Sequence, residues 1–80
     1  MVPNMEPFHA TYCGEGKPDI RIAIRQDRPE AFYVDLEKDG RSAVHTWPAI
    51  GPASVSVIEL LLRYKHEFGS GYDLKQLTQD

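Results

Sequence analysis

The sequence of 80 residues has one cysteine, no long apolar run and no excess of positive charge. A lone cysteine, Cys13, excludes an intramolecular disulfide, which is typical of a reducing compartment. The first residues, MVPNMEPFHATY, lack the basic and apolar segments of a signal peptide. The longest apolar stretch, VIELLL, is interrupted by Glu59 and is far shorter than the ~20 residues that span a bilayer. We therefore expect a cytoplasmic protein with no membrane segment.

The charge balance argues against a dedicated nucleic-acid-binding protein. Nine Lys and Arg residues stand against twelve Asp and Glu residues, which gives a net charge of −3. Neutralisation of phosphates supplies most of the affinity of duplex-binding modules, so such modules are normally basic. The balance disfavours nucleic acid as a partner without removing it from consideration.

Motifs that would carry catalysis, a metal or a cofactor are missing. His9 and Cys13 are four residues apart, whereas a structural zinc site usually has two short ligand pairs. Gly14-Glu15-Gly16 lacks the third glycine and the strand–turn–helix context of a nucleotide-binding loop. We predict that the protein is not an enzyme, has no catalytic residues, and has no metal site or cofactor.

The apolar residues follow the period of two that is typical of strands. The alternation is clearest over residues 19–25 (DIRIAIR) and 31–37 (AFYVDLE), and weaker over 8–13 (FHATYC). Residues 41–47 (RSAVHTW) follow an Asp-Gly turn signal and form a further candidate strand. A chain of this length makes one domain, over residues 1–80, in which 1–7 and 70–80 are the segments that we expect to be loose.

One helix is predicted after the strands, over residues 52–68. Ser56 and Glu59 have the spacing of a capping box, and Gly69 is a typical residue after a helix end. The sequence therefore predicts an α+β fold, an antiparallel meander of three or four strands with one C-terminal helix packed on one face. Leu60 falls beside the apolar stripe, and a solvent-facing Leu60 next to Tyr64 would allow a homodimer through the helix.

The hairpin around Asp39-Gly40 has two plausible registers. A two-residue loop places Lys38 opposite Arg41 and turns Ala43, His45 and Trp47 toward the core. A three-residue loop places Glu37 opposite Arg41, turns Ser42, Val44 and Thr46 toward the core, and turns His45 and Trp47 toward solvent. The three-residue loop pairs opposite charges, whereas the two-residue loop pairs like charges, so we favour the three-residue loop.

This register predicts a binding surface on the side of the sheet that no helix covers. Its residues are Arg21, Arg25, Tyr33, His45 and Trp47, and Trp, Tyr and Arg are the residue types that dominate binding hot spots. We predict a small non-enzymatic protein-binding module or regulator that acts through this exposed sheet face. The alternative is a single-stranded nucleic-acid-binding protein in which the same aromatic and arginine side chains contact bases and phosphates. The sequence does not indicate which protein is the partner.

Overall fold

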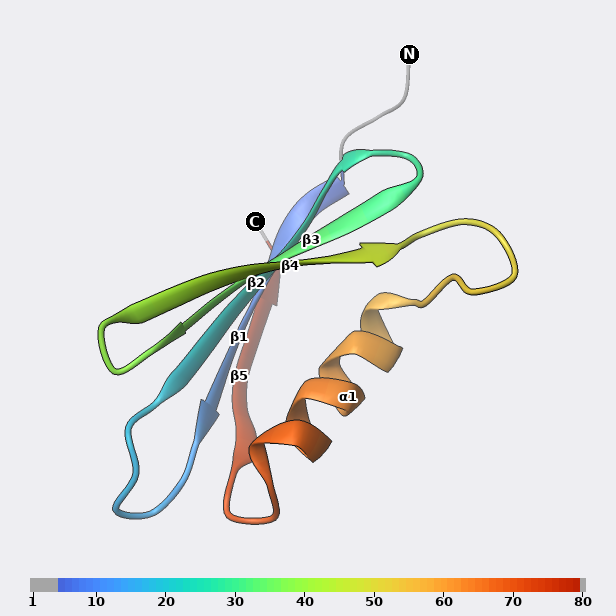
Figure 1. Cartoon of the computed structure of the whole chain (residues 1–80). Helices are drawn as coiled ribbons and strands as arrows, with labels where there is room; N and C mark the ends of the chain where they lie inside the picture. Colours follow the sequence, from blue (N-terminus) through green and yellow to red (C-terminus); the bar gives the residue numbers. More distant parts are fainter. Residues whose placement is uncertain (1–4, 80) are drawn as a thin grey trace.

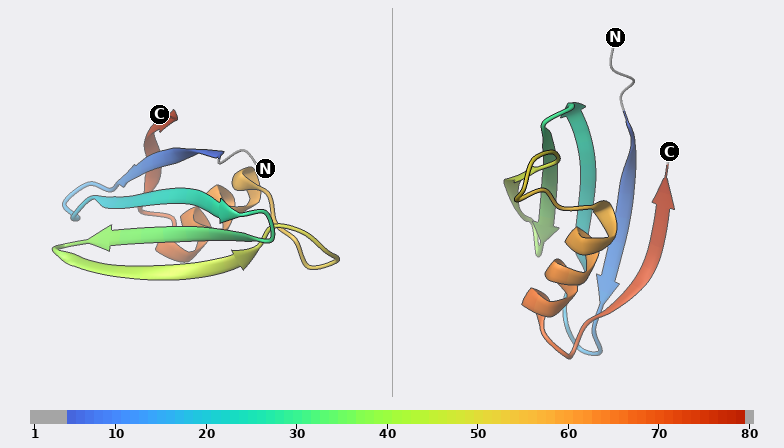
Figure 2. Two further views of the ribbon diagram at one scale, coloured as in Figure 1. Left: turned by 90° about the horizontal axis from the view of Figure 1, so that it is seen from above. Right: turned by 90° about the vertical axis from the view of Figure 1, so that its right-hand side faces the viewer.

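The computed structural model describes the backbone of residues 5–79 and the side chains from Pro7 onward. Its elements are β1 (Met5–Cys13), β2 (Ile20–Arg28), β3 (Ala31–Lys38), β4 (Arg41–Pro48), α1 (Val57–Phe68) and β5 (Asp73–Gln79). The strands form one antiparallel sheet in the order β4-β3-β2-β1-β5, and α1 lies across one face of it (Figures 1 and 2). The predicted α+β fold, an antiparallel meander with a single helix on one face, is confirmed, and the sheet has five strands where three or four were expected. No helix within the described range is long and apolar enough to cross a membrane.

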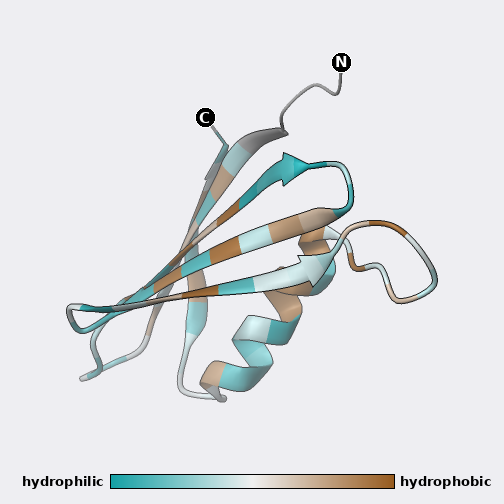
Figure 3. Ribbon diagram, turned by 45° about the horizontal axis from the view of Figure 1, so that its top comes forward, coloured by the Kyte–Doolittle hydropathy of each residue, from teal (hydrophilic) through white to brown (hydrophobic). Residues whose placement is uncertain are grey.

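The core lies between α1 and the covered face of the sheet, which we call the helix face. Apolar and polar residues alternate along the central strands, as Figure 3 shows by colour. Burial of each large apolar side chain stabilises the fold by about 1.5–3 kcal/mol. The most deeply buried members, each at most 2% exposed, are Ala10, Tyr12, Ile20, Ile22, Ile24, Val34, Leu60 and Tyr64.

The phenol of Tyr12 ties the sheet to the helix. Its hydroxyl donates a hydrogen bond of 2.9 Å to the backbone carbonyl oxygen of Leu61 in α1. Its ring meets that of Phe68 edge to face, with the centroids 5.1 Å apart. Burial raises the pKa of Tyr12 to about 12, because an ionised phenolate would lose its hydration there.

The helix is shorter than predicted, and it buries Leu60 together with Leu61 and Tyr64. It begins at Val57, where Ser56 is the N-cap and its Oγ accepts a hydrogen bond of 3.1 Å from the backbone N–H of Glu59. Leu60 is fully buried, so the prediction of a solvent-facing Leu60 for a helix-mediated homodimer was wrong. The buried stripe is centred between Leu60 and Leu61, which leaves Ile58 on the exposed flank.

We expected the segment after the helix to be loose. It instead forms β5, which pairs with β1. Ala10 pairs with Leu77 and Tyr12 with Leu74, although these two leucines are three residues apart. A register shift between these pairs breaks the alternation, and this hid the strand in the sequence. The other segment predicted to be loose contributes residues 5–7 to β1, while residues 1–4 lie outside the described part.

The chain enters β5 by packing against the turn between β1 and β2. Tyr72 is 4% exposed, and its hydroxyl donates a hydrogen bond of 2.9 Å to the carbonyl oxygen of Pro18. At Gly14 the two segments approach so closely that a Cβ atom would lie 2.5 Å from the carbonyl oxygen of Gly71. This contact fixes the start of β5.

The β3–β4 hairpin has the two-residue loop, so the register that we favoured was wrong. Lys38 pairs with Arg41, and the φ angles of Asp39 (54°) and Gly40 (76°) are both positive, as a type I′ turn requires. The repulsion between two exposed cations is small in water. The other register would expose an indole and place two hydroxyl side chains behind the helix, which costs more.

Candidate functional site

The register places two of the five predicted site residues on the helix face, which corrects the predicted surface. The indole Nε1–H of Trp47 donates a hydrogen bond of 2.9 Å to the hydroxyl of Tyr64, and the Nδ1 of His45 lies 2.8 Å from the same hydroxyl. Tyr64 accepts from the indole and can donate its own proton to a neutral imidazole, so this arrangement satisfies all three groups. His45 and Trp47 therefore belong to the contact between β4 and α1, and not to the uncovered side of the sheet.

The hydroxyl of Tyr64 lies in a buried aromatic cluster. The side chain is 1% exposed, and burial raises the pKa of its phenol, an effect that the hydrogen bond from Trp47 partly offsets. On the outside of the cluster the Arg63 guanidinium lies 5.4 Å from the ring centre of Trp47. Trp47 is half-buried and lines an open hollow of about 510 Å³ beside the helix.

The opposite side of the sheet, which we call the outer face, has no described element over it (Figure 2). Its side chains form three rows across the strands, as the strand pairings specify. The first row is Gln76, Thr11, Arg21, Glu37 and Ser42; the second is Thr78, His9, Ala23, Asp35 and Val44; the third is Arg25, Tyr33 and Thr46. Arg21, Arg25 and Tyr33 lie on this face as predicted.

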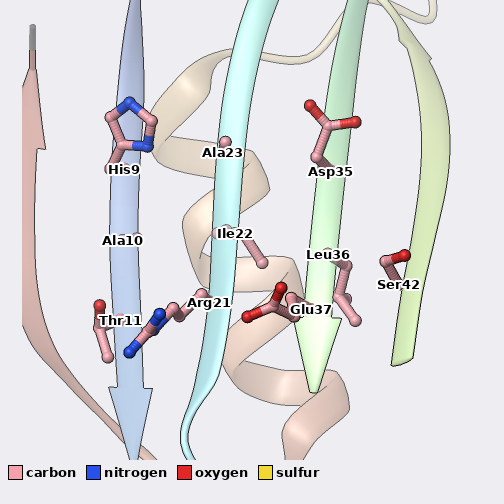
Figure 4. A pocket seen from close by; sticks show the side chains of 10 residues that line it. All are labelled: His9, Ala10, Thr11, Arg21, Ile22, Ala23, Asp35, Leu36, Glu37 and Ser42. Carbon is pink, nitrogen blue, oxygen red and sulfur yellow. The ribbon is translucent and has the colours of Figure 1, made fainter. Parts of the chain in front are cut away.

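An open hollow of about 350 Å³ lies on the outer face above the middle strands. Ala23 contributes only a methyl group, which leaves a depression in the surface of the sheet, and longer side chains surround it (Figure 4). Arg21 extends over β1 toward Thr11, while Glu37 lies between β2 and β3. The hollow therefore has a cation on its β1 side and carboxylates on its β3 side.

Arg25 and Tyr33 form a contact group beside the hollow. The Nε of Arg25 donates a hydrogen bond of 3.0 Å to Asp35, and its Nη1 contacts Asp27. Its guanidinium lies 5.1 Å from the ring centre of Tyr33. The hydrogen bond to Asp35 is the main cause that raises the pKa of Arg25. Two carboxylates thus orient the guanidinium of Arg25 beside the Tyr33 ring.

The residues around Cys13 are arranged unfavourably for nucleophilic chemistry. Burial raises the pKa of the Cys13 thiol, and a hydrogen bond with Asp19 raises it further. A catalytic cysteine needs the opposite shift, because the thiolate is the reactive form. Among residues 7–79, whose side chains the structure describes, no three His, Cys, Asp or Glu side chains are grouped so that they could hold a metal ion.

Comparisons with known proteins found no relative of this chain. The chain matches no family model, no curated protein and no solved structure.

Sequence reasoning missed His9, Thr11 and Ser42 as neighbours of the hollow. The alternation in 8–13 does put His9 and Thr11 on one side of a strand, but it does not say which strand lies beside it. The segment between Cys13 and Ile20 has no two-residue hairpin signal, so the β1–β2 register could not be derived. Ser42 was assigned to the core because of the wrong β3–β4 register.

Proposed function

We propose that this protein is a non-enzymatic module that binds another protein through its outer face, with the hollow above Ala23 at the centre of the site. The observation that carries the proposal is the separation of two charges. Arg21 and Glu37 are direct neighbours in the β2–β3 register, yet no ion pair joins them in the described part of the chain.

This charge separation favours a partner surface that carries both signs. A carboxylate of the partner would meet Arg21, and an ammonium or guanidinium group would meet Glu37, on opposite sides of the hollow (Figure 4). Complementary charges of this kind fix the orientation of a partner and raise the association rate more than they raise affinity. Arg21 and Glu37 are both exposed, and an exposed ion pair contributes little to stability. The fold therefore loses little free energy while the two charges are hydrated and unpaired.

The group formed by Arg25 and Tyr33 supports the same proposal. Tyrosine and arginine are enriched among the residues that contribute most to interfaces. Asp35 already orients Arg25, so binding costs less side-chain entropy at this position. A partner would therefore meet a preformed contact area next to the charged hollow.

The shape of the hollow favours a protein over a small molecule. Sites for small ligands enclose most of the ligand surface, whereas this hollow is open along the sheet. One side chain of a partner fits a hollow of about 350 Å³, and the flat rows around it offer contact to the neighbouring surface. Interfaces of standard size need about 800 Å² from each partner, which is within reach of such a sheet face.

Single-stranded nucleic acid is a weaker alternative than the sequence indicated. That hypothesis relied on Tyr33, His45 and Trp47 as a stacking platform, and only Tyr33 lies on the outer face. Asp35 and Glu37 line the hollow and would repel a phosphate backbone. We therefore propose a protein as the partner, and nucleic acid becomes one arm of the test.

The test compares charge reversals inside and outside the hollow. Immobilised wild type, Arg21→Glu, Glu37→Arg and the control Glu15→Arg are exposed to extract of the source cells, and the retained proteins are quantified by mass spectrometry. Glu15 lies in the turn after β1, so Glu15→Arg makes the same charge change away from the outer face. We expect a protein that wild type and the control retain and both hollow variants lose.

Two results would contradict the proposal. Equal retention of every specific protein by all four baits would exclude the hollow as the site. Salt-sensitive binding of a single-stranded oligonucleotide, abolished by Arg21→Glu, would replace the protein partner by nucleic acid. Circular dichroism of each variant checks that the fold is unchanged.

A further inference from the structure

The two edges of the sheet differ in how well they are protected against strand addition. β5 pairs with β1 through a register shift and carries Lys75 in its middle, both of which discourage further pairing. β4 pairs with β3 without a shift, and between Arg41 and Pro48 it has no Lys, Arg, Asp or Glu. Residues 41–46 of β4 are all exposed. The edge at β4 is therefore regular, accessible and unprotected.

The hairpin register identifies which backbone groups this edge presents. In an antiparallel pair the residues point their N–H and C=O groups alternately toward the partner strand and away from it. The residues that flank a two-residue loop bond to each other, so the odd-numbered residues of β4 point toward β3. The hydrogen bond of 2.9 Å from the Ala49 N–H to the Glu30 carbonyl oxygen continues this pattern. Ser42, Val44 and Thr46 thus point their backbone groups outward, and we call these groups the free edge.

The free edge is complementary to itself. Ser42 and Thr46 are evenly spaced about Val44, so a two-fold axis at Val44 places Val44 opposite its own copy and Ser42 opposite Thr46. In this register all three residues of each chain meet outward-pointing residues of the other, which makes six backbone hydrogen bonds on the pairing rule. A shift by two residues in either direction leaves only two such pairs, and on one side it brings in Pro48, which has no N–H.

The side chains fit the same register. Val44 is 59% exposed on the outer face, where an isolated valine gains nothing. In the two-fold pair the two Val44 side chains contact each other, and the hydroxyl groups of Ser42 and Thr46 stand opposite one another, which is a favourable cross-strand pair. No two charges of like sign face each other across the axis.

We propose that a second copy of this chain adds to the edge at β4, antiparallel and about a two-fold axis at Val44, to give one continuous sheet with both helices on the same side. The two hollows then lie on the same outer face of the dimer. This inference is independent of the proposed function, because no step of it uses Arg21 or Glu37.

The experiment measures mass by size-exclusion chromatography with light scattering over a dilution series. Wild type is expected to have the mass of two chains at high concentration. Val44→Lys places two ammonium groups at the axis and is expected to be monomeric, whereas Leu77→Lys, the matched change on β5, stays dimeric. Arg21→Glu also stays dimeric, which separates this test from that of the hollow.

A second measurement locates the axis even where Val44→Lys fails to fold. In a Cys13→Ser background, Val44→Cys brings two Cα atoms to about 5.5 Å, within the range that a disulfide bridges. Mild oxidation is expected to give a covalent dimer of Val44→Cys and none of Leu77→Cys. A wild-type monomer at every concentration, a dimer that Leu77→Lys breaks, or no disulfide at residue 44 would each overturn the proposal.

Discussion

Removal of one hydroxyl group tests how β4 is attached to the helix. Tyr64→Phe keeps the ring but removes the oxygen that Trp47 and His45 contact at 2.9 and 2.8 Å. A hydrogen bond contributes about 0.5–1.5 kcal/mol to stability, so two of them contribute about 1–3 kcal/mol. His45 is exposed and Trp47 only half-buried, so water replaces part of the loss. We therefore expect Tyr64→Phe to lower the free energy of unfolding by roughly 1.5 kcal/mol and the melting temperature by roughly 6–12 °C.

A double-mutant cycle assigns this loss to the contact itself. Wild type, Tyr64→Phe, Trp47→Phe and the double variant are unfolded in urea and followed by circular dichroism. Residues in contact couple by 0.5–3 kcal/mol, so we expect a coupling free energy of about 1 kcal/mol between Tyr64 and Trp47. Tyr33→Phe is the matched control, since Tyr33 lies on the outer face and its change should stay within about 0.5 kcal/mol.

The refuting result follows from the two hairpin registers. In the three-residue register Trp47 would lie on the outer face, where it cannot reach Tyr64. A coupling free energy of zero, together with a Tyr64→Phe variant as stable as the Tyr33→Phe control, would show that the indole and the phenol do not meet.

Three further predictions concern the sheet, the turn and the helix. The pKa of Tyr12 is raised to about 12 in the folded state, so its contribution to stability is complete below about pH 10 and falls by up to about 2 kcal/mol as the pH approaches 12. Denaturant unfolding between about pH 9 and about pH 11.5 should therefore show a steeper loss of stability in wild type than in Tyr12→Phe, and parallel curves would contradict this. Gly14→Ala should cost about 2 kcal/mol, because its Cβ would lie 2.5 Å from the Gly71 carbonyl oxygen; an unchanged melting temperature would disprove this close approach. Ser56→Ala should cost about 1 kcal/mol in urea unfolding through the lost bond to the Glu59 N–H, whereas no change would show that Ser56 does not cap the helix.

Local patterns in the sequence predicted most of the fold. The alternation of Ile20, Ile22 and Ile24 identified a strand with one buried side, and the structure buries all three. We placed the start of the helix at residue 52, but it begins directly after Ser56, which is the N-cap. It ends directly before Gly69, as the sequence indicated. These features depend on neighbours in the sequence, and for that reason they could be read directly.

The parts that could not be predicted depend on contacts between distant residues. The hairpin register was chosen from one exposed charge pair, Glu37 with Arg41, but the burial of Trp47 against Tyr64 decides it. β5 was hidden because a register shift breaks its alternation. Arg21 was placed correctly on the outer face, since its parity in β2 fixes its side of the sheet.

The two-residue hairpin register places Trp47 against the helix and leaves the outer face and the β4 edge open. Nuclear Overhauser effects between Hα protons test it directly, because they are strong only between opposite residues that do not bond to each other. The structure predicts cross-peaks between Asp35 and Val44 and between Tyr33 and Thr46. Cross-peaks between Val34 and Val44 would instead establish the three-residue register, in which Trp47 lies on the outer face away from Tyr64.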